Sequence, residues 1–413
     1  MITGGIIMKT QDSSTDVRKI LDIVKYLASE NFAPRASMYD RESRFPYENY
    51  QDLHEHGLIG LVVPKEYGGL GADSFLMGEV LREIAKADGS TANTFNMHCT
   101  VINILKEMAN EEQKKRLFTE VVKEGKLFAS VTSEPTSSLR GNFRPSTIAR
   151  KVEGGYLVKG TKHFASLSSA ANYFNTLCLL EGAESTEDGL IMLVIPREVP
   201  GIISGIKVEE TWDSMGMRGT ASNTVHFQDC FVAEENVIGE PGDAIRKHVS
   251  DGYAFGFGAI GVGLAEAALD FTVQYAKSTT FKPDSHPISH YSSIQQRVAE
   301  MRLEIEAAKL FLSQAAYARD NESPEQRVLP VTLAKYAGTE VSIKLTDLAI
   351  RVCGGRAYMR KYPLERIHRD ARAGMVMPPN NDKCLEIIGK STLGLEVSAG
   401  WLEQSKKSNS KNV

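Results

Sequence analysis

His98 and Cys99 are two reactive side chains that stand next to each other in the sequence. Together they suggest a nucleophile and base pair. The residues around them predict a helix, in which neighbouring side chains point about 100° apart. We therefore interpret both as core or wall residues, with His98 bordering a substrate cavity as the alternative.

The cysteines are the other candidates for chemistry. Five isolated cysteines, with no CxxC pair and no His-rich neighbourhood, give no zinc-ligand spacing, so no metal site is expected. They are interpreted as reduced thiols of a cytoplasmic protein: Cys99, Cys178, Cys230, Cys353 and Cys384.

The 413 residues are 42% hydrophobic and 24% charged, which is typical of a globular chain with two or three domains. A net charge of −4 and scattered Lys and Arg residues argue against a nucleic-acid partner. No apolar run approaches the ~20 residues of a membrane span, so none is expected. The N-terminus lacks a signal or presequence pattern, which favours a cytoplasmic location, and Met8 is an alternative start.

Hydrophobic periodicity divides the chain into three structured parts. Residues 1–125 predict an all-α domain, interrupted by a glycine-rich turn at Gly57–Gly71. Residues 126–239 predict a β-domain, a barrel or sandwich, with a hairpin turn at 153–155. Residues 240–400 predict a four-helix bundle of long amphipathic helices, and residues 401–413 predict a flexible tail. The expected fold is a multidomain α+β protein.

Four stretches in this order resemble the acyl-CoA dehydrogenase family of flavoproteins. They are the glycine-rich turn, the strand at 128–135 with the stretch 160–166 that follows it after a hairpin, the end of the β-domain at 212–239, and the last helices. In the last helices the motif is Cys353-Gly354-Gly355 followed by Arg369-Asp370-Ala371-Arg372. The resemblance covers nearly the whole chain and implies a flavin-dependent oxidoreductase.

The resemblance also implies FAD as cofactor, with FMN as the alternative. It implies a homo-oligomer, a dimer or tetramer, because the family builds each flavin site from two chains. A flavin ring needs an apolar slot with donors at its polar edge. Hydroxyls on strands and the aromatic Phe164 fit this need. The cofactor-binding residues expected on this basis are Thr132, Ser133, Ser138, Phe164, Ser166, Phe281, Arg351, Gly354, Gly355 and Asn380.

The chain departs from the family at the catalytic base. The glutamate that usually follows the Arg-Asp-Ala-Arg motif falls on Pro378, and the glutamate that a subgroup carries on an earlier helix falls on Tyr253. Proline has no proton-accepting side chain, and a phenol with a pKa of ~10 is a poor base. The nearest carboxylates are Asp251, which a helix would turn ~200° away, Asp382 and, further on, Glu386. Asp382 and Glu386 are interpreted as solvated or capping groups, with a relocated base as the alternative. The base is therefore unknown, and Asp251 and Asp382 are its candidates.

A second departure concerns the pyrophosphate. Ser278 stands where the family often has an arginine, and Arg351 is a candidate to replace the lost charge, because a guanidinium can pair bidentately with phosphate.

Three functions stay open. The first is a dehydrogenase or reductase of an acyl thioester, on CoA or a carrier protein, with an atypical base and an electron-transfer partner. The second is a flavin monooxygenase or oxidase that works with a flavin reductase or oxygen, for which the missing base costs nothing. The third is a non-catalytic flavin-binding protein, since a fold does not guarantee a function.

Overall fold

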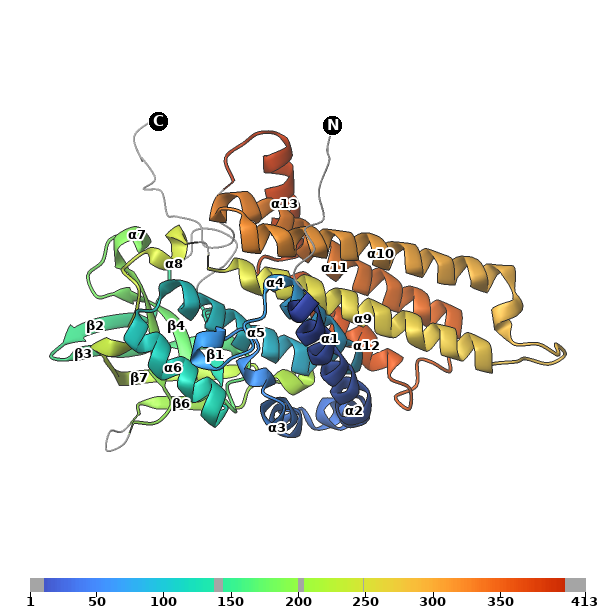
Figure 1. Cartoon of the computed structure of the whole chain (residues 1–413), viewed down its shortest axis with the longest axis horizontal. Coiled ribbons are helices and arrows are strands. Elements are labelled where there is room, and N and C mark those ends of the chain that lie inside the picture. Colours follow the sequence, from blue (N-terminus) through green and yellow to red (C-terminus); the bar gives the residue numbers. More distant parts are fainter. Residues whose placement is uncertain (1–10, 137–143, 200–203, 248, 398–413) are drawn as a thin grey trace.

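The computed structural model describes residues 11–136, 144–199, 204–247 and 249–397. Helices form the N-terminal part, strands the middle and long helices the C-terminal part, as Figure 1 shows. The predicted fold class is confirmed.

Two of the N-terminal helices, α4 (Ser74–Ala87) and α5 (Gly89–Met108), each begin at a capping aspartate. The Asp73 carboxylate accepts the backbone N–H of Leu76 at 2.9 Å, and the Asp88 carboxylate accepts that of Thr91 at 3.2 Å. Such N-caps satisfy donors that have no partner inside the helix. The glycine-rich turn contains two single helical turns, Leu58–Gly60 and Lys65–Tyr67. The helices are α1 (Gln11–Tyr26), the π-helix Leu27–Phe32, α2 (Ala33–Glu42), α3 (Tyr47–Glu55), α4 (Ser74–Ala87), α5 (Gly89–Met108) and α6 (Glu111–Glu124).

The β-domain is one eight-stranded sheet in the order β6-β7-β3-β2-β4-β5-β8, with β1 paired in parallel to β4. The predicted hairpin is confirmed, because Val152 pairs with Gly155 across the turn and Gly154 has a φ of 74°. The strands are β1 (Phe128–Val131), β2 (Ile148–Val152), β3 (Gly155–Ala165), β4 (Tyr173–Leu180), β5 (Leu190–Pro196), β6 (Ile206–Glu209), β7 (Asn223–Ala233) and β8 (Val237–Ile238). Short helices α7 (Thr186–Gly189) and α8 (Asp243–Arg246) flank β5 and β8.

The C-terminal part is built around α9 (Asp251–Ser278), which packs against α10 (Ser292–Asn321) and α11 (Pro324–Cys353). Glycines let α9 and α11 approach closely: a Cβ on Gly261 would lie 2.2 Å from the Gly338 carbonyl oxygen. The helices α12 (Leu364–Val376) and α13 (Asn381–Thr392) pack on α11, and α12 also reaches α9.

Helix α9 corrects one sequence expectation. It is long and apolar enough to cross a membrane by length and composition, whereas no such segment was expected. In the structure 89% of the 18-residue apolar stretch of this helix is buried. Its apolar character is explained by its place between the N-terminal helices and the rest of the bundle, because a helix that is apolar all round must be buried.

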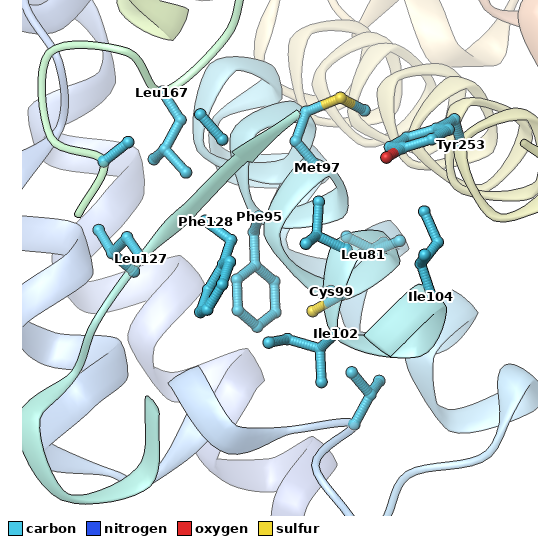
Figure 2. Packing of buried hydrophobic residues seen from close by; sticks show 14 of the residues in the cluster. Leu81, Phe95, Met97, Cys99, Ile102, Ile104, Leu127, Phe128, Leu167 and Tyr253 are labelled. Carbon is cyan, nitrogen blue, oxygen red and sulfur yellow. The ribbon is translucent and has the colours of Figure 1, made fainter. Parts of the chain in front are cut away.

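One hydrophobic cluster joins all three parts around α5, as Figure 2 shows. Phe95 and Cys99 of α5 are fully buried beside Phe128 of β1, and Tyr253 of α9 enters from the bundle. Burial of this kind contributes roughly 25 cal/mol per Å² of apolar surface. It fixes the start of α9 and the end of β1 relative to α5.

Candidate functional site

A cavity of about 940 Å³ lies where the three parts of the chain meet. Its walls come from α5, the residues after β1 and β3, the segment before β7, the start of α9, and α12 with the loop that follows it. Apolar side chains line most of it, including Met97, Phe164, Trp212, Met215, Met217, Phe257, Met375 and Met377.

Two segments beside the cavity hold backbone conformations that side-chain-bearing residues rarely adopt. Phe164 and Leu167 have φ values of 53° and 72°, and Met217 and Ala221 have values of 51° and 44°. Left-handed conformations of this kind cost about 1–2 kcal/mol each and concentrate at functional sites. The Leu167 N–H donates to the Thr220 carbonyl at 2.9 Å, so each segment holds the other.

Hydroxyl groups form a short chain on the same wall. The Ser222 hydroxyl lies 2.7 Å from both the Ser166 and the Thr220 hydroxyls. Ser166, Thr132 and Ser133 line the cavity as expected, but they follow β3 and β1 instead of lying on these strands. That part of the prediction was wrong, because where a strand ends depends on its pairing with β4 and β7, which local sequence does not reveal.

Phe164 is the aromatic wall that the sequence suggested. Its side chain is 66% exposed within the chain, and its ring meets Trp212 edge to face at 6.3 Å. An exposed aromatic ring on a strained backbone, beside hydroxyl donors and an apolar cavity, fits the flat ring of a flavin.

Both sequence positions expected for a base line the cavity, and neither carries a carboxylate. Pro378 lies in the loop after α12, and Tyr253 lies in the first turn of α9. Burial raises the pKa of the Tyr253 phenol, which is hydrogen-bonded to Ser130. A neutral phenol at this place can donate or accept a hydrogen bond but cannot remove a proton from carbon at neutral pH.

The alternative carboxylates lie elsewhere. Asp251 is turned away from the cavity and pairs with Arg327 at 2.6 Å and Arg319 at 3.8 Å, so it is ion-paired instead of solvated. Asp382 is exposed in the first turn of α13. Glu386 pairs with two lysines of its own helix, Lys383 and Lys390, at 3.1 and 2.6 Å.

Among the described residues, the carboxylate that lines the cavity is Glu134. It accepts hydrogen bonds from Ser146 and Thr147 and pairs with Lys162 at 2.8 Å. Burial by itself would raise its pKa, but the Lys162 charge and these hydrogen bonds lower it to about 2. A carboxylate held this firmly in its charged form is a structural group, not a base.

Asp370 of the Arg-Asp-Ala-Arg motif also has a structural place. Burial raises its pKa to about 7, and it accepts the Met217 N–H at 2.6 Å while facing Arg366 at 3.5 Å. Its neighbour Arg369 forms two bonds to Asp40, at 2.8 and 2.7 Å, and donates to the Met215 carbonyl. The motif thus ties the cavity-lining segment at Met215 and Met217 to α12 and α2.

The remaining expected flavin contacts fall into two groups. Asn380 lines the cavity and caps α13, accepting the Lys383 N–H at 2.9 Å. Four others lie away from this cavity, on the loop after α9 or at the end of α11: Phe281, Arg351, Gly354 and Gly355. The Arg351 side chain is 75% exposed and pairs with Asp347 at 2.8 Å. Ser138 lies outside the described residues.

His98 and Cys99 do not border the cavity. His98 is fully buried, with its Nδ1 accepting the Phe128 N–H at 3.2 Å and its Nε2 3.0 Å from the Ile59 carbonyl. Burial lowers the pKa of this imidazole to about 4 and raises the pKa of the Cys99 thiol. Both are core groups, as interpreted from the sequence, and all five cysteines are free and buried.

Sequence reasoning missed four cavity residues that lie on three helices. They are Asn93 and Met97 on α5, and Phe257 on α9 with His368 on α12. Asn93 and Met97 are four residues apart, as are Tyr253 and Phe257, so each pair lies on one helical face. The spacing was visible, but nothing in the sequence distinguished these faces from ordinary core.

Three domain models of one family match the chain: Acyl-CoA dehydrogenase, N-terminal domain, at 14–124; middle domain at 129–230; and C-terminal domain at 253–393. The acryloyl-CoA reductase (NADH) of Anaerotignum propionicum is 30% identical over 88% of this chain and 92% of its own length. Butyryl-CoA dehydrogenase from Megasphaera elsdenii has a TM-score of 0.85 at 25% identity, covering 94% of this chain and 100% of that one. TdsC from Paenibacillus sp. A11-2, solved with FMN and indole, has a TM-score of 0.84 at 25% identity with the same coverage. The chain therefore belongs to the acyl-CoA dehydrogenase family.

Proposed function

We propose that the chain is a flavin-dependent oxidoreductase whose flavin and substrate share the cavity between the three parts of the chain. The supporting features are the exposed Phe164 ring, the hydroxyls of Thr132, Ser133 and Ser166, and the apolar walls. A bound flavin would supply the electron transfer, and these residues would hold its ring and exclude water.

We propose further that the reaction is an oxygenation or oxidation with molecular oxygen, carried out on a small and mostly apolar substrate. The observation that carries this proposal is the state of the cavity's carboxylate: within the described ranges, Glu134 lines the cavity and is paired with Lys162. Removal of a carbon-bound proton needs a base within hydrogen-bond reach whose pKa suits the task. Oxygen chemistry needs a dry, shielded cavity instead, and the methionine and aromatic walls, which are partly exposed in the single chain, would provide one when flavin and substrate cover them. Balanced as a monooxygenation, one oxygen atom of O₂ enters the substrate and the other leaves as water, with two electrons from a flavin reductase and two protons from solvent.

Dehydrogenation or reduction of an acyl thioester is the second candidate. Relatives named butyryl-CoA dehydrogenase and acryloyl-CoA reductase favour it. It requires a proton carrier other than a cavity carboxylate, for which the His368 imidazole on the cavity wall, with a pKa that burial and Arg372 lower, is the candidate. The electrons would pass to or from an electron-transfer partner.

Anaerobic mixing separates the two candidates. Purified flavin-loaded protein that is bleached by butyryl-CoA in the absence of oxygen supports the thioester reaction. Oxygen consumption above the flavin-reductase background on adding indole, with product containing ¹⁸O from ¹⁸O₂, supports oxygenation. Absence of both with a fully loaded flavin would favour a non-catalytic protein.

We infer that the flavin is FAD and that a second copy of the chain completes its site. The bundle end at Gly354 and Gly355 is open, with nothing described within 4 Å of an added Cβ, and Arg351 projects beside it. Apolar residues exposed on the bundle, such as Leu303, Leu310 and Tyr358, would be covered in such an assembly. FMN is the alternative, as in TdsC, and the mass of the released flavin decides between them. A cytoplasmic location stays part of the proposal and fits the reduced, buried thiols.

A further inference from the structure

An unpaired polar atom lies on the part of the cavity wall that α5 contributes. The Asn93 side chain is 2% exposed, and its Oδ1 has no hydrogen-bond partner among the described residues. Asn93 lines both the main cavity and a small void behind it. Buried polar side chains nearly always have a partner, and an acceptor that lines a cavity can receive one from a molecule bound there.

The described neighbours of Asn93 do not supply that partner. Met97, one turn further along α5, and Phe257, on the facing side of α9, are apolar. The Tyr253 hydroxyl, although it lines the same cavity, makes no hydrogen bond to the Asn93 oxygen. Figure 2 shows Met97 and Tyr253 at this place, where α5 and α9 come together.

The small void behind Asn93 is also lined by three polar side chains, Thr339, Ser342 and Asp370. The two hydroxyls donate to the Lys335 and Thr339 carbonyls, and Asp370 accepts the Met217 N–H. Asn93 Oδ1 is therefore an acceptor that none of its described neighbours pairs with.

The nature of the ligand decides whether this acceptor is satisfied. A saturated acyl chain has no hydrogen-bond donor. If such a chain filled the part of the cavity beside Asn93, the Asn93 oxygen would be removed from water and left unpaired, which is unfavourable. A molecule with an N–H or O–H would turn the same oxygen into a source of binding free energy. Sites built to bind such a donor reject the analogue that lacks it.

We propose that Asn93 is a specificity-determining residue that accepts a hydrogen bond from the substrate. The substrate class is then a compact, mostly apolar molecule with one N–H or O–H group, such as an indole, a phenol or a secondary amide. This inference rests on the proposed function, because it takes the cavity as the substrate site. It goes further by naming the group that the substrate must carry.

The test compares indole with 1-methylindole, two ligands of the same ring in which one has lost the donor. Binding to the purified, flavin-loaded protein is measured by calorimetry, so no turnover is required. The wild type should bind indole about 5- to 100-fold more tightly than 1-methylindole, the range expected for a buried hydrogen bond. Asn93→Leu should abolish the difference, and its melting temperature should not fall, because the change removes an unpaired polar atom.

Met97→Leu is the matched control, since it changes the shape of the same wall without a polar atom and should alter both affinities alike. If Asn93→Leu does not fold, Asn93→Ala replaces it. The proposal is overturned if the wild type binds the two ligands equally, if neither binds at millimolar concentration, or if the preference survives in the Asn93 variant. Oxygen consumption is measured separately, so a failure of the oxidase or monooxygenase assignment would leave the binding preference in place.

Discussion

The Lys162 ammonium and the Glu134 carboxylate lie 2.8 Å apart, and neither side chain is exposed to solvent. Lys162 also donates to the Leu177 carbonyl at 2.8 Å, and Glu134 receives bonds from Ser146 and Thr147. A buried charge pair is stable while every lone pair and proton is matched, and breaking one half leaves the other charge uncompensated. The pair therefore holds the residues after β1 against β3 and β4 at the edge of the cavity.

Lys162→Met should destabilise the protein by about 3–5 kcal/mol, because it leaves the Glu134 charge buried without a counterion. Urea unfolding at pH 7 measures this. The double variant Lys162→Met with Glu134→Gln should lose less than the single variant. Lys151→Met is the control: Lys151 pairs with Glu234 at 2.7 Å on the surface, and its loss should cost about 1 kcal/mol or less. Equal losses at the two sites would contradict the buried-pair account.

His98 should make the fold sensitive to mild acid. Its pKa is lowered from 6.5 to about 4 in the folded chain by burial. Between these pH values the unfolded chain binds a proton that the folded chain does not, so stability is complete above pH 6.5 and falls as the pH drops towards 4. At pH 5 this group should cost about 2 kcal/mol relative to pH 7.

Glutamine does not titrate in this range, so His98→Gln should lose less stability than the wild type between pH 7 and pH 5. At pH 7 it should be less stable than the wild type, because the change disturbs the buried hydrogen bonds of His98 to Phe128 and Ile59. Unfolding free energies at the two pH values for both proteins give the comparison. An unchanged pH dependence in the variant would show that other groups control the acid sensitivity.

Phe164→Gly should separate stability from flavin binding. Phe164 has a φ of 53°, a conformation that glycine adopts without strain, so the flavin-free protein should be stabilised or unchanged. The loss of the aromatic wall should weaken flavin binding by about two- to tenfold, the range of one aromatic contact. Asp229→Gly, at a φ of 50° on β7 away from the cavity, should affect stability alone. Thermal melting without flavin and titration with flavin provide the two readouts.

The crossing of α9 and α11 should not tolerate a single added methyl group. Gly261→Ala places a Cβ 2.2 Å from the Gly338 carbonyl, so the helices must separate, at a cost of about 1–3 kcal/mol. Gly389→Ala in α13 meets nothing within 4 Å among the described atoms and should stabilise by about 0.5–1 kcal/mol. Thermal melting of the two variants should therefore shift in opposite directions, and a shift in the same direction would argue against close packing at this crossing.

Helical geometry made part of the site predictable. Asp251 and Tyr253 are two residues apart on one helix, so they had to point to different sides, and they do. The hairpin at Gly154 was also predictable, because its turn signal is local. The ends of β1 and β3 were not, since strand ends are decided by partners far along the chain. Glu134 was missed for the same reason: its counterion, Lys162, lies 28 residues away.

The sequence by itself determined the order of the three parts and the side-chain types at Pro378 and Tyr253, because residue identity and local periodicity do not depend on packing. Tertiary structure decided which carboxylates reach the cavity. Asp251 is ion-paired with Arg327 and Arg319, and Asp382 is exposed to solvent. Glu134 lines the cavity, but its charge is paired with Lys162. The tertiary structure also left the Asn93 oxygen on the cavity wall without a hydrogen-bond partner among the described residues. Long-range packing sets the distances between charges and donors, and those distances determine whether a residue can act as a base, a structural pair or a ligand contact.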